Sequence, residues 1–225
     1  MQLIKQPSYL QSEPPHPTGA VIWLHGLGAS NTDLFEGLWQ AVSPSCQEQY
    51  RAIFLQAPDR PISINGGMSM PAWYDIYGLS DEAPTDSIGL HQSIETVQQV
   101  IATQAADPAV SGRIVIAGFS QGGALALHAG FRALHPIHQI HVFSGYVPMQ
   151  ASLVEGISPV NRACPVTFYH GMADDVVPES FMQQGASYLA TKGVSTSVQC
   201  YQGLGHGIHA DSLAMFANQV LKQSA

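Results

Sequence analysis

The sequence predicts an α/β fold in which a mainly parallel central sheet carries helices on both faces. Short apolar runs rich in β-branched residues alternate with segments of helical period, as they do in strand–helix–strand units. The apolar runs show little polar alternation, which is typical of strands covered on both faces. No internal repeat or low-complexity linker divides the 225 residues, so we expect one domain over residues 1–225.

The strands and helices expected from these patterns follow one another closely along the chain. Buried strands are predicted at 20–24, 52–55, 113–117, 140–143 and 165–169, with a half-exposed strand near the sheet edge at 195–201. Helices are predicted at 33–42, 86–103, 121–134, 179–191 and 210–222. Asp86 stands where it can cap the second helix, and Gly193 stands where it can end the fourth.

A long stretch at 57–85 has no regular pattern. It is rich in proline and glycine, but it also contains methionine, tyrosine and tryptophan, which makes it too apolar for a disordered segment. Loops of this length in compact domains are usually functional. We therefore expect this stretch to fold over a site.

Composition limits the partners and the compartment. The chain has 8 Lys and Arg against 16 Asp and Glu, a net charge of −8, so it lacks the basic face that nucleic acid would need. No apolar window reaches the length of a membrane span, so stable membrane insertion is not expected. The 3 cysteines are widely spaced and the N-terminus lacks a signal-like apolar core, which predicts a cytoplasmic protein. Charged residues make up only 11%, which leaves a homodimer open.

The segment Gly118-Phe-Ser120-Gln-Gly122 has the form G-x-S-x-G. It falls between a predicted strand and a predicted helix, where a nucleophile elbow lifts a serine hydroxyl above the sheet. Glycine on either side of the serine allows strand and helix to approach closely. Ser120 is therefore the candidate nucleophile, and the alternative is a glycine-rich turn that exposes a serine.

A serine nucleophile needs a base and an orienting carboxylate. His206 lies in a glycine-rich loop after the predicted edge strand and is the candidate base, while nearby His209 begins the last predicted helix, where capping is the usual role. Asp174 and Asp175 compete for the acid in the loop after strand 165–169. The order Ser, Asp, His along the chain is that of α/β-hydrolases.

An oxyanion hole needs two backbone N–H groups aimed at the developing charge. Gln121, directly after the candidate nucleophile, can supply one. The turn His25-Gly-Leu27-Gly follows the first buried strand and can supply the other from Leu27. The alternative for this second segment is a glycine-rich turn without a catalytic role.

These motifs resemble the bacterial carboxylesterase and acyl-protein thioesterase (phospholipase/carboxylesterase) family of α/β-hydrolases along nearly the whole chain. The matching stretches lie at 24–28, 70–76, 118–123, 144–148, 170–178 and 205–206. The resemblance implies an α/β-hydrolase fold with Ser120 as nucleophile, Asp174 as acid and His206 as base. It also implies that Leu27 and Gln121 are the oxyanion donors and that Trp73 lines the substrate site. The approach to the histidine at 201–205 departs from the family, because relatives often have one residue fewer and a proline there.

Two other groups of residues are candidate ligand sites. Met68 and Met70 lie close to Trp73 in the sequence, and the three are expected to line an acyl pocket; the alternative is a local core under the loop. The spaced residues His135, His138 and His141 would point to opposite faces of a strand and have no acidic or cysteine partner, so we expect no metal there.

The sequence therefore predicts a serine hydrolase that cleaves carboxylic esters of short to medium acyl chains through an acyl-enzyme, without a cofactor. The expected partner is a small-molecule ester or thioester. One alternative is an acyl-protein thioesterase or lysophospholipase that acts on long chains. A dienelactone-hydrolase-like enzyme usually has cysteine at the elbow, where this chain has Ser120. A catalytically silent α/β-hydrolase that serves as a binding module is a further alternative.

Overall fold

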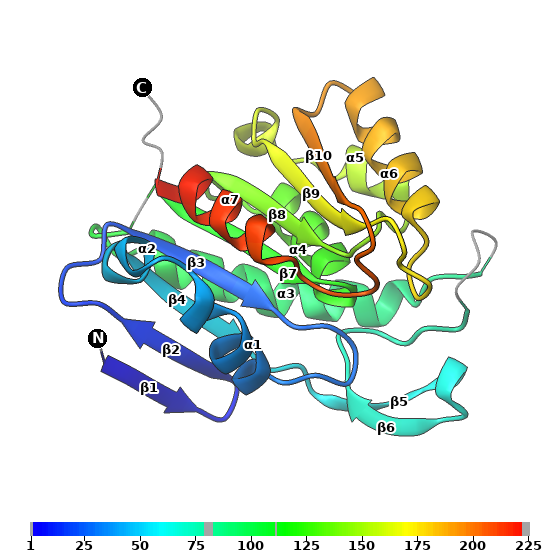
Figure 1. Ribbon diagram of the computed structural model, residues 1–225, viewed down its shortest axis with the longest axis horizontal. Coiled ribbons are helices and arrows are strands. Elements are labelled where there is room, and N and C mark those ends of the chain that lie inside the picture. Colours follow the sequence, from blue (N-terminus) through cyan, green and yellow to red (C-terminus); the bar gives the residue numbers. More distant parts are fainter. Residues whose placement is uncertain (1, 79–82, 111, 222–225) are drawn as a thin grey trace.

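A central sheet of eight strands organises the computed structural model, which describes residues 2–78, 83–110 and 112–221 (Figure 1). The strand order is β1-β2-β4-β3-β7-β8-β9-β10. In this sheet β4, β3, β7, β8, β9 and β10 pair in parallel, whereas β1 and β2 pair antiparallel at one edge, which confirms the mainly parallel sheet. Their bounds are β1 Gln2–Gln6, β2 Tyr9–Glu13, β3 Gly19–Leu24, β4 Tyr50–Leu55, β7 Ile114–Phe119, β8 Gln139–Phe143, β9 Val166–Gly171 and β10 Thr196–Tyr201.

Helices cover both faces of this sheet, as predicted. Successive side chains of a strand point to opposite faces, so Ile22 packs into one core and Trp23 into another. The core with Trp23 includes residues of α1 (Asn31–Gly37), α2 (Pro44–Gln49) and α7 (Ala210–Leu221). The core with Ile22 includes residues of α3 (Ser87–Ala105), α4 (Gln121–Arg132), α5 (Gln150–Glu155) and α6 (Glu179–Thr191).

Most predicted elements lie where the sequence placed them. Asp86 caps α3 by accepting a hydrogen bond from the Gly89 N–H at 2.9 Å, and α6 spans the predicted residues. The helix expected at 33–42 is instead broken, because Leu38 leaves the helical region and a 3-10 turn follows at Trp39–Ala41. Residue 222, the predicted end of the last helix, lies outside the described residues.

Two hairpins were not predicted. β1 and β2 form an antiparallel edge from residues with few apolar side chains. The stretch at 57–85, expected to be irregular, contains a second hairpin of β5 (Asp59–Ile62) and β6 (Met68–Pro71), with a 3-10 turn at Ser63–Asn65. Residues 79–82 of that stretch lie outside the described residues. Short strands with proline and glycine give little periodic signal, which explains why the hairpin was missed.

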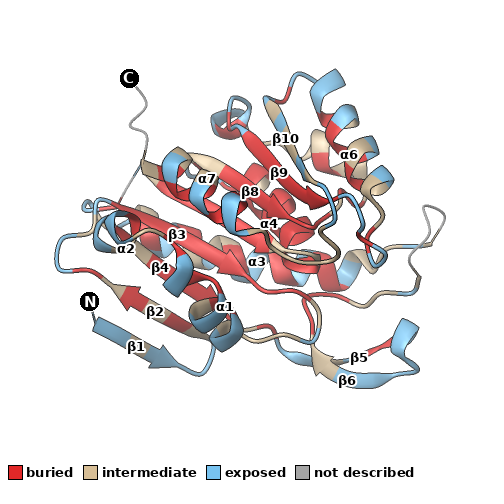
Figure 2. Ribbon diagram, in the orientation of Figure 1, coloured by how far each residue is buried: buried red, intermediate tan, exposed pale blue. Residues whose placement is uncertain are grey.

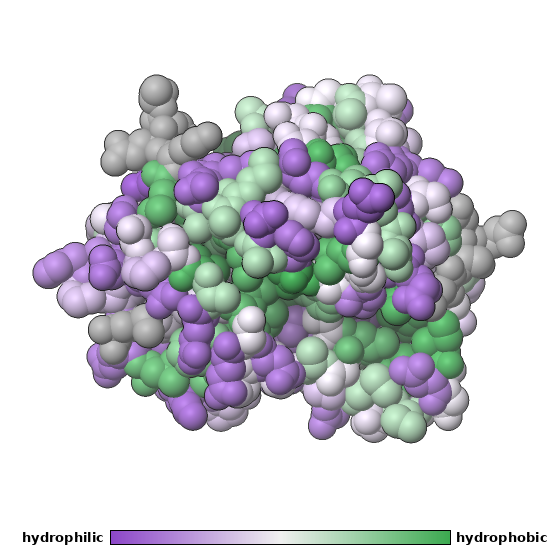
Figure 3. Space-filling model, in the orientation of Figure 1, coloured by the Kyte–Doolittle hydropathy of each residue, from purple (hydrophilic) through white to green (hydrophobic). Residues whose placement is uncertain are grey.

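The β5–β6 hairpin projects from the body of the molecule and is largely exposed (Figure 2). Apolar side chains gather on this side of the surface (Figure 3), and Ile64, Met68 and Tyr77 are among the exposed large hydrophobic residues. Of the helices in the described ranges, none is long and apolar enough to cross a bilayer.

Candidate active site

Ser120 occupies a strained turn between β7, which ends at Phe119, and α4, which begins at Gln121. Its φ of 53° and ψ of −118° are uncommon for any residue other than glycine. The turn is held by a hydrogen bond from the Ser120 N–H to the Phe143 carbonyl at 2.8 Å and by another from the Gly123 N–H to the Ser120 carbonyl at 2.9 Å. Backbone strain of this kind persists only where its surroundings fix it, and it concentrates at functional sites.

The glycines on either side of Ser120 are required by close backbone contacts. A Cβ on Gly118 would lie 2.2 Å from the Gly122 carbonyl oxygen, and a Cβ on Gly122 would lie 2.2 Å from the Leu24 carbonyl oxygen. The start of α4 therefore rests directly on the end of β3. This is the close strand–helix approach that the G-x-S-x-G motif predicts.

The turn after β3 approaches the same serine. A Cβ on Gly26 would lie 3.4 Å from the Cβ of Ser120. The Gly28 N–H already has a partner within the protein, because it donates a hydrogen bond to the Pro71 carbonyl at 2.8 Å. Within the described part of the chain, the N–H groups of Leu27 and Gln121 donate no backbone or side-chain hydrogen bond. Two unused donors therefore come from the two loops that meet at Ser120.

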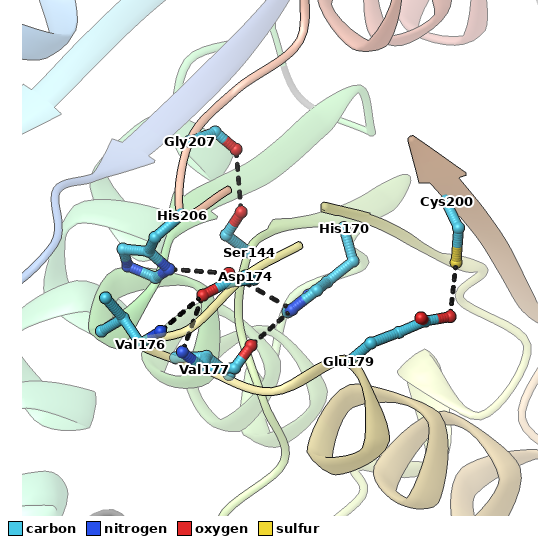
Figure 4. Close-up of polar contacts among 9 residues, drawn as sticks. All are labelled: Ser144, His170, Asp174, Val176, Val177, Glu179, Cys200, His206 and Gly207. Carbon is cyan, nitrogen blue, oxygen red and sulfur yellow. Dashed lines mark hydrogen bonds and ion pairs between the residues drawn. The ribbon is translucent and has the colours of Figure 1, made fainter. Parts of the chain in front are cut away.

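The His206 and Asp174 side chains are hydrogen-bonded, with Nδ1 and Oδ2 2.8 Å apart (Figure 4). The other carboxylate oxygen of Asp174 accepts from the N–H groups of Val176 at 3.0 Å and Val177 at 2.8 Å. The Asp174 side chain is fully buried, whereas 18% of the His206 side chain is exposed. The sequence predicted both residues, and the structure brings them into contact.

The bond to Asp174 also determines which nitrogen of His206 can act as a base. A carboxylate accepts a hydrogen bond, so Nδ1 of the neutral ring carries the proton and the Nε2 lone pair is free. The imidazole lies against the Phe119 ring, with 4.9 Å between centroids, and Phe119 is the residue before Ser120. The loop that carries His206 therefore lies beside the elbow.

Two further side chains support this pair. His170 Nε2 lies 2.8 Å from the Val177 carbonyl and 3.4 Å from Oδ2 of Asp174 (Figure 4), so it lies directly behind the carboxylate. Ser144 has a positive φ of 46°, and its hydroxyl donates to the carbonyl of Gly207, the residue after His206, at 2.8 Å. Both lie in stretches on which the family resemblance rests, although neither residue was assigned a role from the sequence.

The competing candidates lie elsewhere. His209 precedes α7, stacks on the Tyr201 ring with 4.7 Å between centroids, and accepts a hydrogen bond from the Asp211 N–H at 3.1 Å. These contacts are those of a helix-capping residue. Asp175 is exposed, in contrast to its buried neighbour Asp174.

A pocket of about 390 Å³ opens between the segment after β6, the loop after β8 and the start of α6. Tyr74 and Tyr146 meet there, with their hydroxyl oxygens 2.7 Å apart. Val177 and Phe181 contribute apolar walls. The lining residues are Tyr74, Asp75, Ile76, Tyr77, Gly78, Ala83, Pro84, Thr85, Tyr146, Val147, Pro148, Met149, Gln150, Val176, Val177, Phe181 and Gln184.

The three residues expected to line an acyl pocket do not line this one. Met68 is 64% exposed on the β5–β6 hairpin, and Met70 lies beside the turn after β3, with its sulfur 3.6 Å from where a Cβ on Gly28 would lie. Trp73 is only 1% exposed and donates from its indole Nε1 to the His25 carbonyl at 2.8 Å. Met68 and Met70 lie in β6, a short strand that was not predicted, and Trp73 lies in the irregular segment after it, so no periodic signal indicated the directions of these side chains.

Of the three spaced histidines, His141 has a packing role, whereas His135 is exposed. His141 is buried, with Nδ1 3.2 Å from the Tyr169 hydroxyl and Nε2 3.0 Å from Oε1 of Gln139. Burial lowers the pKa of His141 to about 3. Among the residues described, no group of three or more His, Cys, Asp or Glu side chains is arranged to hold a metal ion.

A mainly parallel sheet with helices on both faces, together with a strained serine between a strand and a helix at its carboxyl edge, defines an α/β-hydrolase. Comparison with known proteins specifies the family. The chain belongs to the phospholipase/carboxylesterase family, whose sequence model matches residues 8–224.

Individual relatives agree with this family. A probable carboxylesterase of rice (Oryza sativa subsp. japonica) is 37% identical over 195 residues, which cover 86% of this chain and 73% of the rice protein. Acyl-protein thioesterase 1 of Schizosaccharomyces pombe is 31% identical over 206 residues, 88% of each chain. The crystal structure of Arabidopsis thaliana SOBER1 superposes with a TM-score of 0.84 at 26% identity and covers 90% of this chain and 97% of SOBER1. The protein is a carboxylic ester hydrolase, and a bacterial origin stays a prediction.

Proposed function

We propose that the protein hydrolyses carboxylic esters through an acyl-enzyme formed on Ser120, with His206 as general base and Asp174 as the carboxylate that orients it. The observation that carries the proposal is the His206–Asp174 contact at 2.8 Å. Two backbone N–H groups bind the Asp174 carboxylate and restrict its orientation. Its bond to Nδ1 therefore favours one tautomer of the His206 imidazole. That tautomer leaves Nε2 able to accept the serine proton.

The proposed reaction has two halves. In the first, His206 Nε2 takes the Ser120 proton while Oγ attacks the acyl carbon, and the N–H groups of Leu27 and Gln121 bind the oxyanion. His206 then protonates the leaving alcohol or thiol. In the second half, His206 takes a proton from water, which attacks the acyl-enzyme, and the proton returns to Ser120 as the acid leaves. Every step is a proton transfer or an addition to, or elimination from, the acyl carbon, and the residues named supply each of these without a cofactor.

The pocket is the proposed binding site for the acyl group. Three of its residues connect the pocket to the reacting groups. The Tyr74 carbonyl accepts a hydrogen bond from the Gln121 side chain at 2.7 Å, and the Val177 N–H donates to the Asp174 carboxylate. The third, Tyr146, directly follows Gly145. A Cβ on Gly145 would lie 3.2 Å from the Ser120 carbonyl, so that segment borders the elbow. Apolar walls suit an acyl chain, and the paired tyrosine hydroxyls add a polar surface. We propose that short to medium chains fit best.

Thioester cleavage is the second candidate, and the thioesterase relative favours it. The same residues would act, because a thioester also passes through a tetrahedral oxyanion. The leaving thiol needs less protonation than an alkoxide. The relative rates on esters and thioesters and the preferred chain length distinguish the two candidates.

The test is a series of initial rates on p-nitrophenyl esters from acetyl to palmitoyl, with a matched acyl thioester, for the wild type and Ser120→Ala. We expect a maximum at short to medium chains and loss of activity in the variant. A maximum on long chains or on the thioester would favour the second candidate. A folded wild type that neither hydrolyses these substrates nor reacts with a fluorophosphonate would indicate the silent binding module.

Cytoplasmic location and self-association stay predictions from composition. Sedimentation equilibrium at working concentration tests the second. We expect a dimer mass if the apolar surface pairs with a second copy, and a monomer mass would contradict this.

A further inference from the structure

Trp73 connects the two loops that hold the proposed oxyanion donors. Its indole Nε1–H donates to the His25 carbonyl at 2.8 Å, in the turn that carries Leu27. Its backbone N–H donates to the Gln121 side-chain oxygen at 3.0 Å, on the first residue of α4. The two bonds lie at opposite ends of one rigid residue. We call this arrangement the Trp73 bridge.

The surrounding contacts fix the bridge in place. The Trp73 carbonyl accepts a hydrogen bond from the Ser93 hydroxyl of α3, and the Gln121 side-chain amide donates to the Tyr74 carbonyl at 2.7 Å. Gln121 and Trp73 are both only 1% exposed. A buried, fully paired polar network of this kind restricts the positions of its members, because a broken bond leaves an unpaired buried group.

The His25 end is equally constrained. The ring lies 5.1 Å from the Trp73 ring between centroids. Its Nε2 accepts from the Ala57 N–H at 3.0 Å, so the proton lies on Nδ1, which is 2.7 Å from the Gly26 carbonyl. Burial lowers the pKa of the His25 imidazole, in keeping with the neutral form that these contacts need. The His25 carbonyl also lies 2.5 Å from where a Cβ on Gly122 would lie, so the turn and the elbow are in contact beneath the bridge.

We propose that Trp73 is a positioning residue that fixes the separation of the Leu27 and Gln121 N–H groups through its bonds to His25 and Gln121, and that it does not line the acyl pocket. This inference rests on the proposed function, because the two N–H groups matter for rate only if they bind an oxyanion. Oxyanion stabilisation depends on donors that are already in position when charge develops. The Trp73 bridge joins the segments that carry Leu27 and Gln121 and so holds their N–H groups in place before the charge develops.

Trp73→Phe tests the bridge, because it keeps a ring in the core and removes the Nε1–H donor. Trp39→Phe is the matched control: Trp39 is fully buried, and among the described residues its Nε1 has no hydrogen-bond partner. We expect Trp73→Phe to lower kcat about tenfold to a hundredfold with KM within about twofold of the wild type, since loss of a whole donor costs about 10²–10³ in kcat. Trp39→Phe should leave kcat unchanged.

Gln121→Met breaks the other end of the bridge while keeping the backbone N–H. We expect the same fall in kcat without a rise in KM, and the double variant should be no slower than the slower single variant, because both changes break one connection. A raised KM and an altered chain-length preference in Trp73→Phe, with kcat unchanged, would show a pocket-lining residue instead. Equal losses in Trp39→Phe would show general destabilisation. Either result overturns the proposal.

Hydrogen exchange tests the bridge independently of activity. We expect amides at 25–29 to exchange faster in Trp73→Phe than in the wild type or Trp39→Phe, with the sheet amides unchanged. Unchanged exchange at 25–29 would contradict the bridge even in an active enzyme. A wild type without Ser120-dependent hydrolysis would contradict the proposed function, and the exchange result would still decide whether Trp73 connects the loops.

Discussion

The two halves of the proposed site are built differently. In the acid–base half, His206 and Asp174 come from the loops after two neighbouring strands, β10 and β9, and part of the His206 ring reaches solvent. In the oxyanion half, His25, Trp73 and Gln121 are at most 1% exposed and are joined by hydrogen bonds across the fold. The group that must exchange protons is accessible, whereas the side chains that hold the oxyanion donors in place are enclosed.

The difference follows from what each half has to do. A general base changes its protonation state in every turnover, so its free nitrogen needs access to the leaving group and to water. Oxyanion donors change nothing during the reaction and are effective only if they need no reorganisation. Packing of backbone against backbone at Gly118 and Gly122 provides that rigidity.

The largest effect is expected in the acid–base half, from Asp174→Asn. An amide can donate to His206 Nδ1 and so favour the tautomer that has no lone pair on Nε2, and in serine proteases such a change lowers kcat about 10⁴-fold. Asp175→Asn is the matched control and should have little effect, because Asp175 is exposed. The measurement is kcat on a short p-nitrophenyl ester. Equal losses in the two variants would mean that the acid has been misassigned.

The next largest effect is expected where the two oxyanion loops touch, from Gly122→Ala. The added Cβ would lie 2.2 Å from the Leu24 carbonyl and 2.5 Å from the His25 carbonyl, so the elbow or the turn must shift. We expect kcat to fall about 10²–10³-fold, the loss caused by removal of one donor. Gly37→Ala, where a Cβ meets nothing within 4 Å, should retain full activity. Normal kcat in folded Gly122→Ala would show that the donors tolerate displacement.

A smaller effect is expected from Ser144→Ala, which removes the hydroxyl that bonds the Gly207 carbonyl beside His206. A hydrogen bond of this kind contributes about 1 kcal/mol, equivalent to a roughly fivefold change in rate or stability. Ser144→Gly loses the same bond but relieves the positive φ of 46°, so it should be more stable to urea than Ser144→Ala. If both variants keep wild-type kcat, the loop after β8 does not position the base.

The smallest effect on rate is expected at His128 in α4, whose hydrogen bonds among the described residues go to Arg132 and to Pro148 of the pocket wall, and not to either half of the site. Its Nε2 lies 2.9 Å from the Pro148 carbonyl, its Nδ1 lies 2.7 Å from the Arg132 guanidinium, and burial lowers its pKa to about 4. Protonation therefore favours the unfolded chain. The contribution of neutral His128 to the free energy of unfolding is fully present above about pH 6.5. It is lost as the pH falls toward about 4, by up to about 1.4 kcal/mol per pH unit.

Urea unfolding between pH 7 and pH 4.5 measures this dependence. We expect His128→Gln to be less stable than the wild type at pH 7 but to lose less stability on acidification, with kcat at pH 7 nearly unchanged. The remaining slope includes buried His141, whose pKa is lowered by burial as well. An unchanged slope in His128→Gln would show that His128 does not titrate with unfolding.

The sequence predicts the sheet and the order of the chemical groups because both depend on local patterns. Apolar runs identify β3, β4, β7, β8 and β9, and the G-x-S-x-G motif with its following aspartate and histidine identifies the candidate triad. Two candidates that the sequence left open are separated by the structure, since Asp174 contacts His206 and Asp175 does not. Chain order and residue type were enough to find the region in each case.

The parts that were missed depend on tertiary contacts. Trp73 lies in an irregular segment, and nothing in its neighbours indicates that the indole turns into the core toward His25. The support given by Ser144 has the same origin, because its hydroxyl reaches the Gly207 carbonyl on another loop, whereas His170 of β9 reaches the Val177 carbonyl in the loop that follows its own strand. The β1–β2 edge and the β5–β6 hairpin were missed because their strands are short or polar.

The separation of these residues along the chain bears on folding kinetics. His206 and Asp174 are 32 residues apart, whereas Trp73 lies 48 residues from His25 and 48 from Gln121. Contacts between distant segments form slowly, because closure of long loops loses entropy before the contact stabilises the chain. The bridge also needs β3 paired with β7, which brings Leu24 beside Gly118. The site also needs His206 beside Phe119, two residues that lie farther apart in the chain than the partners of either hydrogen bond in the bridge. On refolding, we therefore expect enzymatic activity to return only when both long-range contacts have formed, after the loops at β9 and β10.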